Sequence, residues 1–194
     1  MITVYFDGLC EPTNPYGIAT YGFEIFRDGI KIHESCGLAC EPLTWQASNN
    51  VAEYTGLIMA LKYLYDNNYI KEEIIMMGDS QLTIYQMVGA YAVNADRLIP
   101  LHKRAMNIAK CFAKLEFRWI PREQNSKADD LSRRAYISYI DSHPDVASKV
   151  LKYSATDKQR QLLRKMGLEF DKYLTKIEAS RLINRNLKYG VAKE

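Results

Sequence analysis

The sequence predicts an α/β fold: a five-stranded mixed sheet flanked by helices, with a small helical hairpin at the C-terminal end. Three observations support this prediction. Residues 2–38 carry three successive strand-like segments, residues 49–139 alternate between helical and strand-like patterns, and residues 156–187 hold two short amphipathic helices. A meander followed by alternating helices and strands is typical of a mixed sheet with helices on its faces.

The first strand ends in a residue that its pattern does not explain. Ile2, Val4 and Phe6 alternate with other β-branched and aromatic residues, as in a strand covered on both faces, and Asp7 then follows. A carboxylate there costs free energy unless a cation meets it. We expect the strand to end at Asp7 and residues 8–17 to form a turn-rich connection.

The next elements are a hairpin and a long helix. Residues 18–38 read as two antiparallel strands joined at Asp28 and Gly29, a dipeptide typical of tight hairpins. Helical spacing then begins, with apolar residues at Tyr54, Leu57, Ile58, Leu61 and Leu64. Residues 48–50 can cap the start of this helix, and residues 67–68 can end it.

The second half of the sheet region continues the alternation. Residues 73–78 form a short buried strand that again leads into an aspartate, Asp79, and a short helix over residues 80–88 follows. A helix over residues 98–112 and a strand over residues 115–121 come next. The last helix, over residues 125–139, is expected to bury Ala128, Leu131, Ala135 and Tyr139.

The chain is expected to divide into a catalytic domain over residues 1–143, a linker over 144–155 and a basic helical extension over 156–194. The linker prediction rests on lost periodicity around residues 141–149. In the extension, Thr156 with Gln159 and Thr175 with Glu178 match the capping-box pattern, and Gly167 suits a helix end.

Charge separates these regions. The net charge of +3 combines −3 over residues 1–143 with +6 over residues 144–194, which predicts cation binding by the first and polyanion binding by the second. The longest uncharged apolar stretch, residues 87–93, is too short to cross a bilayer, so we expect a soluble, cytoplasmic protein. The four scattered cysteines favour reduced thiols; a zinc site from His33, Cys36 and Cys40 would lack a second ligand pair.

Four acidic residues are expected to share one site. Asp7 and Asp79 stand at strand ends, and Glu53 and Asp129 stand in the first turns of helices. Each alone is more simply a cap or a surface charge, but open sheets form their sites at the carboxyl ends of strands. Carboxylates gathered there would repel one another unless divalent cations neutralise them, and such oxygen ligands suit Mg²⁺ or Mn²⁺.

Four stretches in this order, "VYFDGLCEPTNPYG", "SNNVAEYTGLIMAL", "GDSQLTIYQMVGAY" and "WIPREQNSKADDLSRRA", resemble the type 1 ribonuclease H family over residues 1–140. The resemblance implies a ribonuclease H-like fold and makes Asp7, Glu53, Asp79 and Asp129 the catalytic, metal-binding carboxylates. Asp130 competes for the last role, but the family places this ligand four positions after the asparagine that matches Asn125. Two Mg²⁺ ions are implied, with Mn²⁺ as a substitute: one lowers the pKa of the attacking water and the other stabilises the leaving 3′ oxygen.

The implied substrate is the RNA strand of an RNA/DNA hybrid, cut to 5′-phosphate and 3′-hydroxyl ends. The family's contacts to the hybrid's minor groove carry over to Gly8, Cys10, Asn14, Asn49, Asn50 and Gln81. Local roles compete, since Asn14 precedes a proline and Asn49 or Asn50 can cap a helix. In the basic extension, Arg164, Lys165, Arg181 and Arg185 are expected to neutralise phosphates.

Two departures place the sequence with compact members of the family. The basic handle that some members carry after the third acidic motif is missing, and so is the histidine of the loop before the fourth. Arg122 or Glu123 are the candidates to replace that histidine, and His102, on an amphipathic helix, is expected to be structural. The protein is expected to be a monomer.

Two other functions stay open from the sequence. One is a non-catalytic protein of the same fold that binds RNA/DNA hybrids or double-stranded RNA; the presence of all four carboxylates speaks against it. The other is an exonuclease or DNA-strand transferase of this fold. Exonucleases of that group begin with an Asp-x-Glu pair, whereas Gly8 and Leu9 follow Asp7 here.

Overall fold

The computed structural model describes residues 1–190, with side chains as far as residue 187. The last four residues of the extension predicted over 156–194 therefore lie outside the described residues. Contacts within the chain define two compact units, Met1–Tyr139 and Ile140–Glu194.

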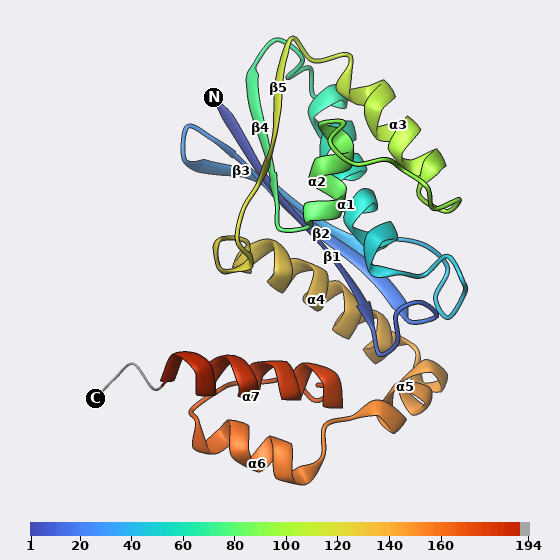
Figure 1. Ribbon diagram of the computed structural model, residues 1–194, viewed down its shortest axis with the longest axis vertical. Coiled ribbons are helices and arrows are strands. Elements are labelled where there is room, and N and C mark those ends of the chain that lie inside the picture. The colour runs from blue at the N-terminus through green and yellow to red at the C-terminus, as the bar shows by residue number, and fades with distance from the viewer. Residues whose placement is uncertain (191–194) are drawn as a thin grey trace. The chain divides into compact units, whose positions relative to one another are not determined.

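The first unit contains the predicted five-stranded mixed sheet (Figure 1), with strands in the order β3-β2-β1-β4-β5. The strands are β1 (Ile2–Glu11), β2 (Ile18–Arg27), β3 (Ile30–Leu38), β4 (Glu73–Gly78) and β5 (Lys114–Trp119). The meander β1–β2–β3 is antiparallel, whereas β4 pairs with β1 in parallel and β5 pairs with β4 in parallel. The predicted hairpin turn is present, with positive φ angles at Asp28 and Gly29.

Helices cover both faces of this sheet. The helices of the first unit are α1 (Asn49–Asp66), α2 (Gln81–Met87), α3 (Ile99–Ala109) and α4 (Ser126–Ser142), with a 3₁₀ turn, η1 (Arg122–Gln124), before α4. The last turn of α4, residues 140–142, falls in the second unit. Figure 1 shows α1, α2 and α3 on one side of the sheet and α4 on the other. Ile2, Val4 and Phe6 of β1 are fully buried in one core cluster with Leu57 and Leu61 of α1.

The prediction that β1 ends at Asp7 is wrong. β1 continues to Glu11, because its antiparallel pairing with β2 extends from Ile2 opposite Arg27 to Glu11 opposite Ile18. What ends here is the parallel pairing with β4, whose last pair is Phe6 with Gly78. Asp7 is therefore the first residue of β1 beyond the end of β4, at the carboxyl edge of the parallel half of the sheet.

The prediction of which residues α4 buries is wrong for the second half of the helix. Ala128 and Leu131 are buried in α4 as predicted, but Tyr136 and Ile140 are fully buried in place of Ala135 and Tyr139, which are half-buried. Buried residues recur every four positions along α4, at Ala128, Ser132, Tyr136 and Ile140. A count of apolar positions misses this row because one of its members is a serine.

In the second unit, the segment predicted as an aperiodic linker is largely helical. Residues 144–153 form α5 (Pro144–Val150) and a 3₁₀ turn, η2 (Leu151–Tyr153). Pro144 occupies the first turn of α5, and Val146 and Val150, four residues apart, are both buried. This apolar pair was the missed sequence signal. The three-domain division itself stays a prediction.

The two predicted helices of the extension are α6 (Asp157–Lys165) and α7 (Lys176–Gly190). The capping box of Thr156 and Gln159 is confirmed, and Gly167 takes a positive φ after the end of α6. A small core holds Ala155, Leu163, Leu174 and Ala179. Among the helices of residues 1–190, none has the length and apolarity that crossing a membrane requires.

Candidate metal centre

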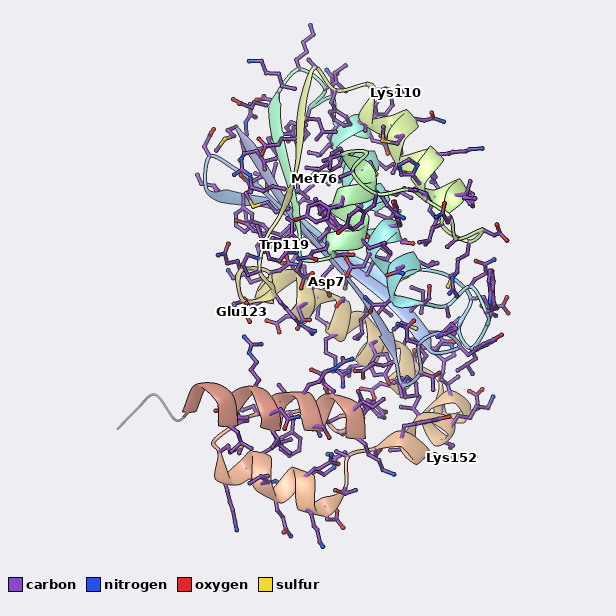
Figure 2. All side chains as sticks on the ribbon, viewed as in Figure 1. Asp7, Met76, Lys110, Trp119, Glu123 and Lys152 are labelled. Carbon is purple, nitrogen blue, oxygen red and sulfur yellow. The ribbon has the colours of Figure 1, made fainter. Side chains whose placement is uncertain are left out.

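Three buried or half-buried carboxylates converge where β1 passes the end of β4. One carboxylate oxygen from each of Asp7, Glu53 and Asp79 lies within 4.8 Å of the others. Figure 2 shows Asp7 in the middle of the first unit. Gly8 lets α1 come this close, because a Cβ atom there would lie 2.2 Å from the backbone nitrogen of Glu53.

The three carboxyl groups resist ionisation. Burial, followed by repulsion from Asp129 and Asp79, raises the pKa of Asp7 to about 8. Burial and the charges of Asp7 and Asp79 also raise the pKa of Glu53 well above its ordinary value. The pKa of Asp79 rises mainly through burial, opposed by Arg122 and by a hydrogen bond from Asn125.

Neighbouring side chains fix the geometry of the site. Asn125 Nδ2 donates to the main-chain oxygen of Phe6 at 2.9 Å and to Asp79 Oδ1 at 3.3 Å, which ties β1 to the residue after β4. The indole Nε1 of Trp119 donates to the main-chain oxygen of Asp79 at 3.0 Å. Ser132 Oγ donates to Asp7 Oδ2 at 2.6 Å. Sequence reasoning missed Trp119 and Ser132, and it used Asn125 only as a spacing marker.

Asp129 lies at the edge of this cluster. It stands in the first turn of α4, where its Oδ1 accepts a hydrogen bond of 2.6 Å from an Arg122 guanidinium nitrogen. Its charge raises the pKa of both Asp7 and Asp79, so it faces the same site. Asp130 instead lines a separate cavity of about 320 Å³ with Glu24, Lys31, Glu34, Lys127, Leu131 and Arg134.

The donor set fits a hard divalent cation. Glu53 Oε2 is buried and has no hydrogen-bond partner among the described residues, which leaves a lone carboxylate oxygen in the site. Carboxylate oxygens this close together are the kind of ligand that hard cations such as Mg²⁺ and Mn²⁺ prefer. No comparable group forms around His33, Cys36 and Cys40 in the described part of the chain, where all four cysteines are free.

Two of the amide candidates for substrate contact, Asn14 and Asn49, are linked to each other and to Glu53. Asn14 Oδ1 accepts a hydrogen bond from the backbone nitrogen of Asn49 at 3.0 Å, and Asn49 Nδ2 lies 3.5 Å from Glu53 Oε1. Ser48 is the residue that caps α1 with its side chain. Asn49 and Asn50 are half-buried in the first turn of α1, and Gln81 is exposed at the start of α2.

Two sets of candidates have other contacts. Cys10 is buried, and its thiol lies within hydrogen-bonding distance of the main-chain oxygens of Thr13 and Ala47.

In the second unit the four basic candidates are exposed: Arg164, Lys165, Arg181 and Arg185. Of these, Arg164 lies over the ring of Phe170 at 5.5 Å, and Arg181 pairs with Glu178 at 3.2 Å.

The expected structural role of His102 agrees with its surroundings. Its ring lies edge-on to Tyr54, with 6.3 Å between the ring centroids, and its Nε2 is 3.3 Å from the main-chain oxygen of Gln86. These contacts belong to the packing between α1, α2 and α3.

Comparison with known proteins gives one family. The model of the reverse transcriptase-like family matches residues 26–135. Ribonuclease HI of Halobacterium salinarum is 36% identical over 136 residues, covering 69% of this chain and 63% of that protein. The bifunctional protein Rv2228c of Mycobacterium tuberculosis is 36% identical over 90 residues, but the chain spans only 24% of its length.

Solved structures agree with the sequence matches. The crystal structure of the Halobacterium salinarum ribonuclease H1 superposes with a TM-score of 0.62 at 31% identity, covering 71% of this chain and 98% of that one. LC11 ribonuclease H1 from compost, solved in complex with an RNA/DNA hybrid, gives a TM-score of 0.64 at 33% identity and covers 72% of this chain and 99% of that one.

Proposed function

Because the chain belongs to the type 1 ribonuclease H family, we propose that it hydrolyses the RNA strand of RNA/DNA hybrids to 5′-phosphate and 3′-hydroxyl ends. The observation that carries the proposal is the convergence of Asp7, Glu53 and Asp79 within 4.8 Å in a buried site. Such a set of carboxylates has little structural use, since burial and mutual repulsion make it costly without a cation.

In this proposal Asp7, Glu53, Asp79 and Asp129 hold two divalent cations, Mg²⁺ with Mn²⁺ as a substitute. When bound, the ions supply an activated water and stabilise the leaving 3′ oxygen at phosphorus. The protein's own part is to orient the carboxylates, whose raised pKa values mean that a bound cation is needed to keep them ionised. Asp129, paired with Arg122, would complete the ligand set from the edge of the site.

Arg122 is the residue we propose in place of the missing loop histidine. Its charge lowers the pKa of Asp7, Glu53 and Asp79, so it already lies within electrostatic reach of the whole cluster. A guanidinium stays protonated at any working pH and cannot shuttle protons. Its role is therefore to balance the negative charge of the carboxylates and of the incoming phosphate. Glu123, which would add negative charge, fits this role less well.

The proposed hybrid contacts are short polar groups beside the metal site. A-like duplexes present their 2′-hydroxyls in a wide, shallow minor groove, which amides and backbone groups can reach without reading sequence. Asn14 and Gln81 are exposed and Asn49 and Asn50 are half-buried, which supports this role for their amides. Gly8 supports the role less, because it is buried against the backbone of Glu53. Cys10 supports the role less, because its thiol is turned to the carbonyls of its own loop and of Ala47.

The basic second unit extends the same proposal. Arg164, Lys165, Arg181 and Arg185 are exposed and would bind phosphates without sequence preference. We also propose that the protein is a monomer in the cytoplasm, where its free thiols would stay reduced.

One comparison of substrates tests the activity. The parent protein is incubated with a labelled RNA/DNA hybrid, an RNA duplex and a DNA duplex, each with Mg²⁺ or Mn²⁺. We expect cleavage of the RNA strand of the hybrid, product ends with 3′-hydroxyl, and an intact DNA duplex. Binding of the hybrid without cleavage in either metal would instead support the non-catalytic alternative.

A further inference from the structure

The hydroxyl of Ser132 has no role in the function proposed above. Ser132 lies on α4 with 1% of its surface exposed, and its Oγ is 2.6 Å from Asp7 Oδ2. The same Oγ is 2.9 Å from the main-chain oxygen of Asp129. A hydroxyl carries a single proton, so it donates to one of these two acceptors at a time.

Charge assigns this proton to Asp7 once a cation is bound. A carboxylate that ligates a cation is ionised, and hydroxyl donors approach ionised carboxylates to about 2.5–2.7 Å. The contact with Asp7 falls in that range. The distance to the main-chain oxygen of Asp129 is that of an ordinary neutral contact.

The approach of α4 to β1 depends on a second feature of the sequence. Gly22 of β2 pairs directly with Asp7, so the two residues face the same side of the sheet. A Cβ atom at Gly22 would lie 2.5 Å from the backbone nitrogen of Ser132. The smallest residue therefore stands where the backbone of α4 has to pass for Ser132 to reach Asp7.

We propose that Ser132 is a positioning residue of the metal site, which holds Asp7 Oδ2 and thereby fixes the plane of the Asp7 carboxylate for cation binding. The inference rests on the proposed function, because it assumes that Asp7 is a ligand. Partners that orient metal ligands in this way typically change metal affinity by about 10- to 100-fold when removed.

Titration calorimetry of the full chain with Mn²⁺, without nucleic acid, tests the proposal. We expect Ser132→Ala to weaken Mn²⁺ binding about 10- to 100-fold and Ser132→Thr, which keeps the hydroxyl, to restore most of the affinity. The matched control is Thr20→Val. It removes another buried hydroxyl, which joins β2 to α4 by donating to the main-chain oxygen of Ser132 at 2.9 Å, and it should leave Mn²⁺ binding within about twofold.

Two results would overturn the role of Ser132: parental Mn²⁺ affinity in the alanine variant, or equal weakening in folded alanine and threonine variants. Circular dichroism at the assay temperature checks the fold. If the alanine variant is unfolded, Ser132→Cys replaces it, because a thiol is a weak donor of similar size. Its Mn²⁺ affinity is then expected to fall about 10- to 100-fold, and parental affinity would overturn the role of Ser132. A parent that neither binds Mn²⁺ nor cleaves the hybrid contradicts the proposed function itself. A parent that does both while Ser132→Ala matches it contradicts only this inference.

Discussion

At the scale of single residues, the site depends on holding negative charge where water cannot screen it. Asp7 is 5% exposed and Glu53 is 3% exposed, and each lies within reach of the other's charge. Without a cation, the state of lowest free energy keeps a proton on the pair. The raised pKa values of Asp7 and Glu53 in the absence of metal are therefore what is expected of a site suited to cations.

The first prediction concerns Asp7→Asn and the pH dependence of stability without metal. The folded-state pKa of Asp7, about 8, lies above the value of 3.8 in the unfolded chain, so its stabilising proton is fully present below pH 4 and lost as pH rises through 8. Asparagine cannot ionise. In EDTA, we expect Asp7→Asn to unfold at the same temperature as the parent or slightly lower at pH 5.

At pH 9, the variant should unfold at least ~2–4 °C above the parent, equivalent to about 1 kcal/mol or more. Thermal unfolding followed by circular dichroism at the two pH values measures the difference. A parent that is as stable as the variant at pH 9 would show that Asp7 ionises without penalty, contrary to this account.

Sequence could name the four carboxylates as candidates only through the four stretches that resemble the ribonuclease H family, because each acid alone is more simply a cap or a surface charge. It could not predict which groups support them. Ser132 and Trp119 reach Asp7 and Asp79 across 125 and 40 positions of the chain, and nothing in a local pattern marks such pairs. Arg122 could be named as a candidate, but its bond to Asp129 needed the geometry of η1 and α4.

At the scale of elements, the site depends on how closely α4 lies on the sheet. Gly22 faces Leu131 and Ser132, and a Cβ atom there would come within 2.5 Å of the Cβ of Leu131. Backbone cannot move aside as a flexible side chain can, so any larger residue pushes α4 away. The distance between α4 and β1 then sets the positions of both Ser132 and Asp129.

We therefore predict that Gly22→Ala destabilises the protein by about 1–3 kcal/mol and lowers the unfolding temperature by ~2 °C or more. The variant should also cleave more slowly than its reduced stability explains. Gly37→Ala is the control, because a Cβ atom there meets only the movable ring of Tyr21, at 3.3 Å from its hydroxyl oxygen. Equal stability of the two variants would mean that α4 does not press on Gly22.

Hydrophobic periodicity predicted most helices and strands. It failed where contacts with distant parts of the chain determine the local structure. β1 continues past Asp7 because β2 supplies a hydrogen-bonding partner as far as Ile18, although the sequence there is rich in turn residues. α5 forms around two valines only, too short a pattern to be recognised. Strong local patterns, such as α1 with its cap at Ser48, were predictable.

At the scale of the whole molecule, charge is divided between the acidic first 143 residues and the basic remainder. The first region carries the cluster that binds cations in our proposal, and the second carries exposed arginines and lysines. A duplex substrate needs both kinds of surface: a metal site for one phosphate and cationic groups for the others. Each charge set lies within one unit, so each can be tested by variants of that unit.

This division predicts a salt effect. We expect Arg164→Gln with Lys165→Gln to weaken hybrid binding and to reduce the slope of log affinity against log salt by up to about 2, or ~0.9 for each phosphate that is no longer neutralised. Fluorescence anisotropy in Ca²⁺ over a series of salt concentrations measures the slope. The control is Lys110→Gln, at the end of α3 (Figure 2), which removes a cation from the first unit. If the parent and the double variant have the same slope, Arg164 and Lys165 do not neutralise phosphates and have another role.

The most direct test of the central claim is single-turnover cleavage of a labelled hybrid by Asp79→Asn in Mg²⁺, compared with Asp66→Asn, an exposed aspartate at the end of α1. Removing a ligand should take away several kcal/mol of transition-state stabilisation. We predict a rate at least ~100-fold below the parent for Asp79→Asn, parental cleavage for Asp66→Asn, and hybrid binding in Ca²⁺ within a few-fold for both. Parental cleavage by Asp79→Asn would show that the clustered carboxylates are not the catalytic centre.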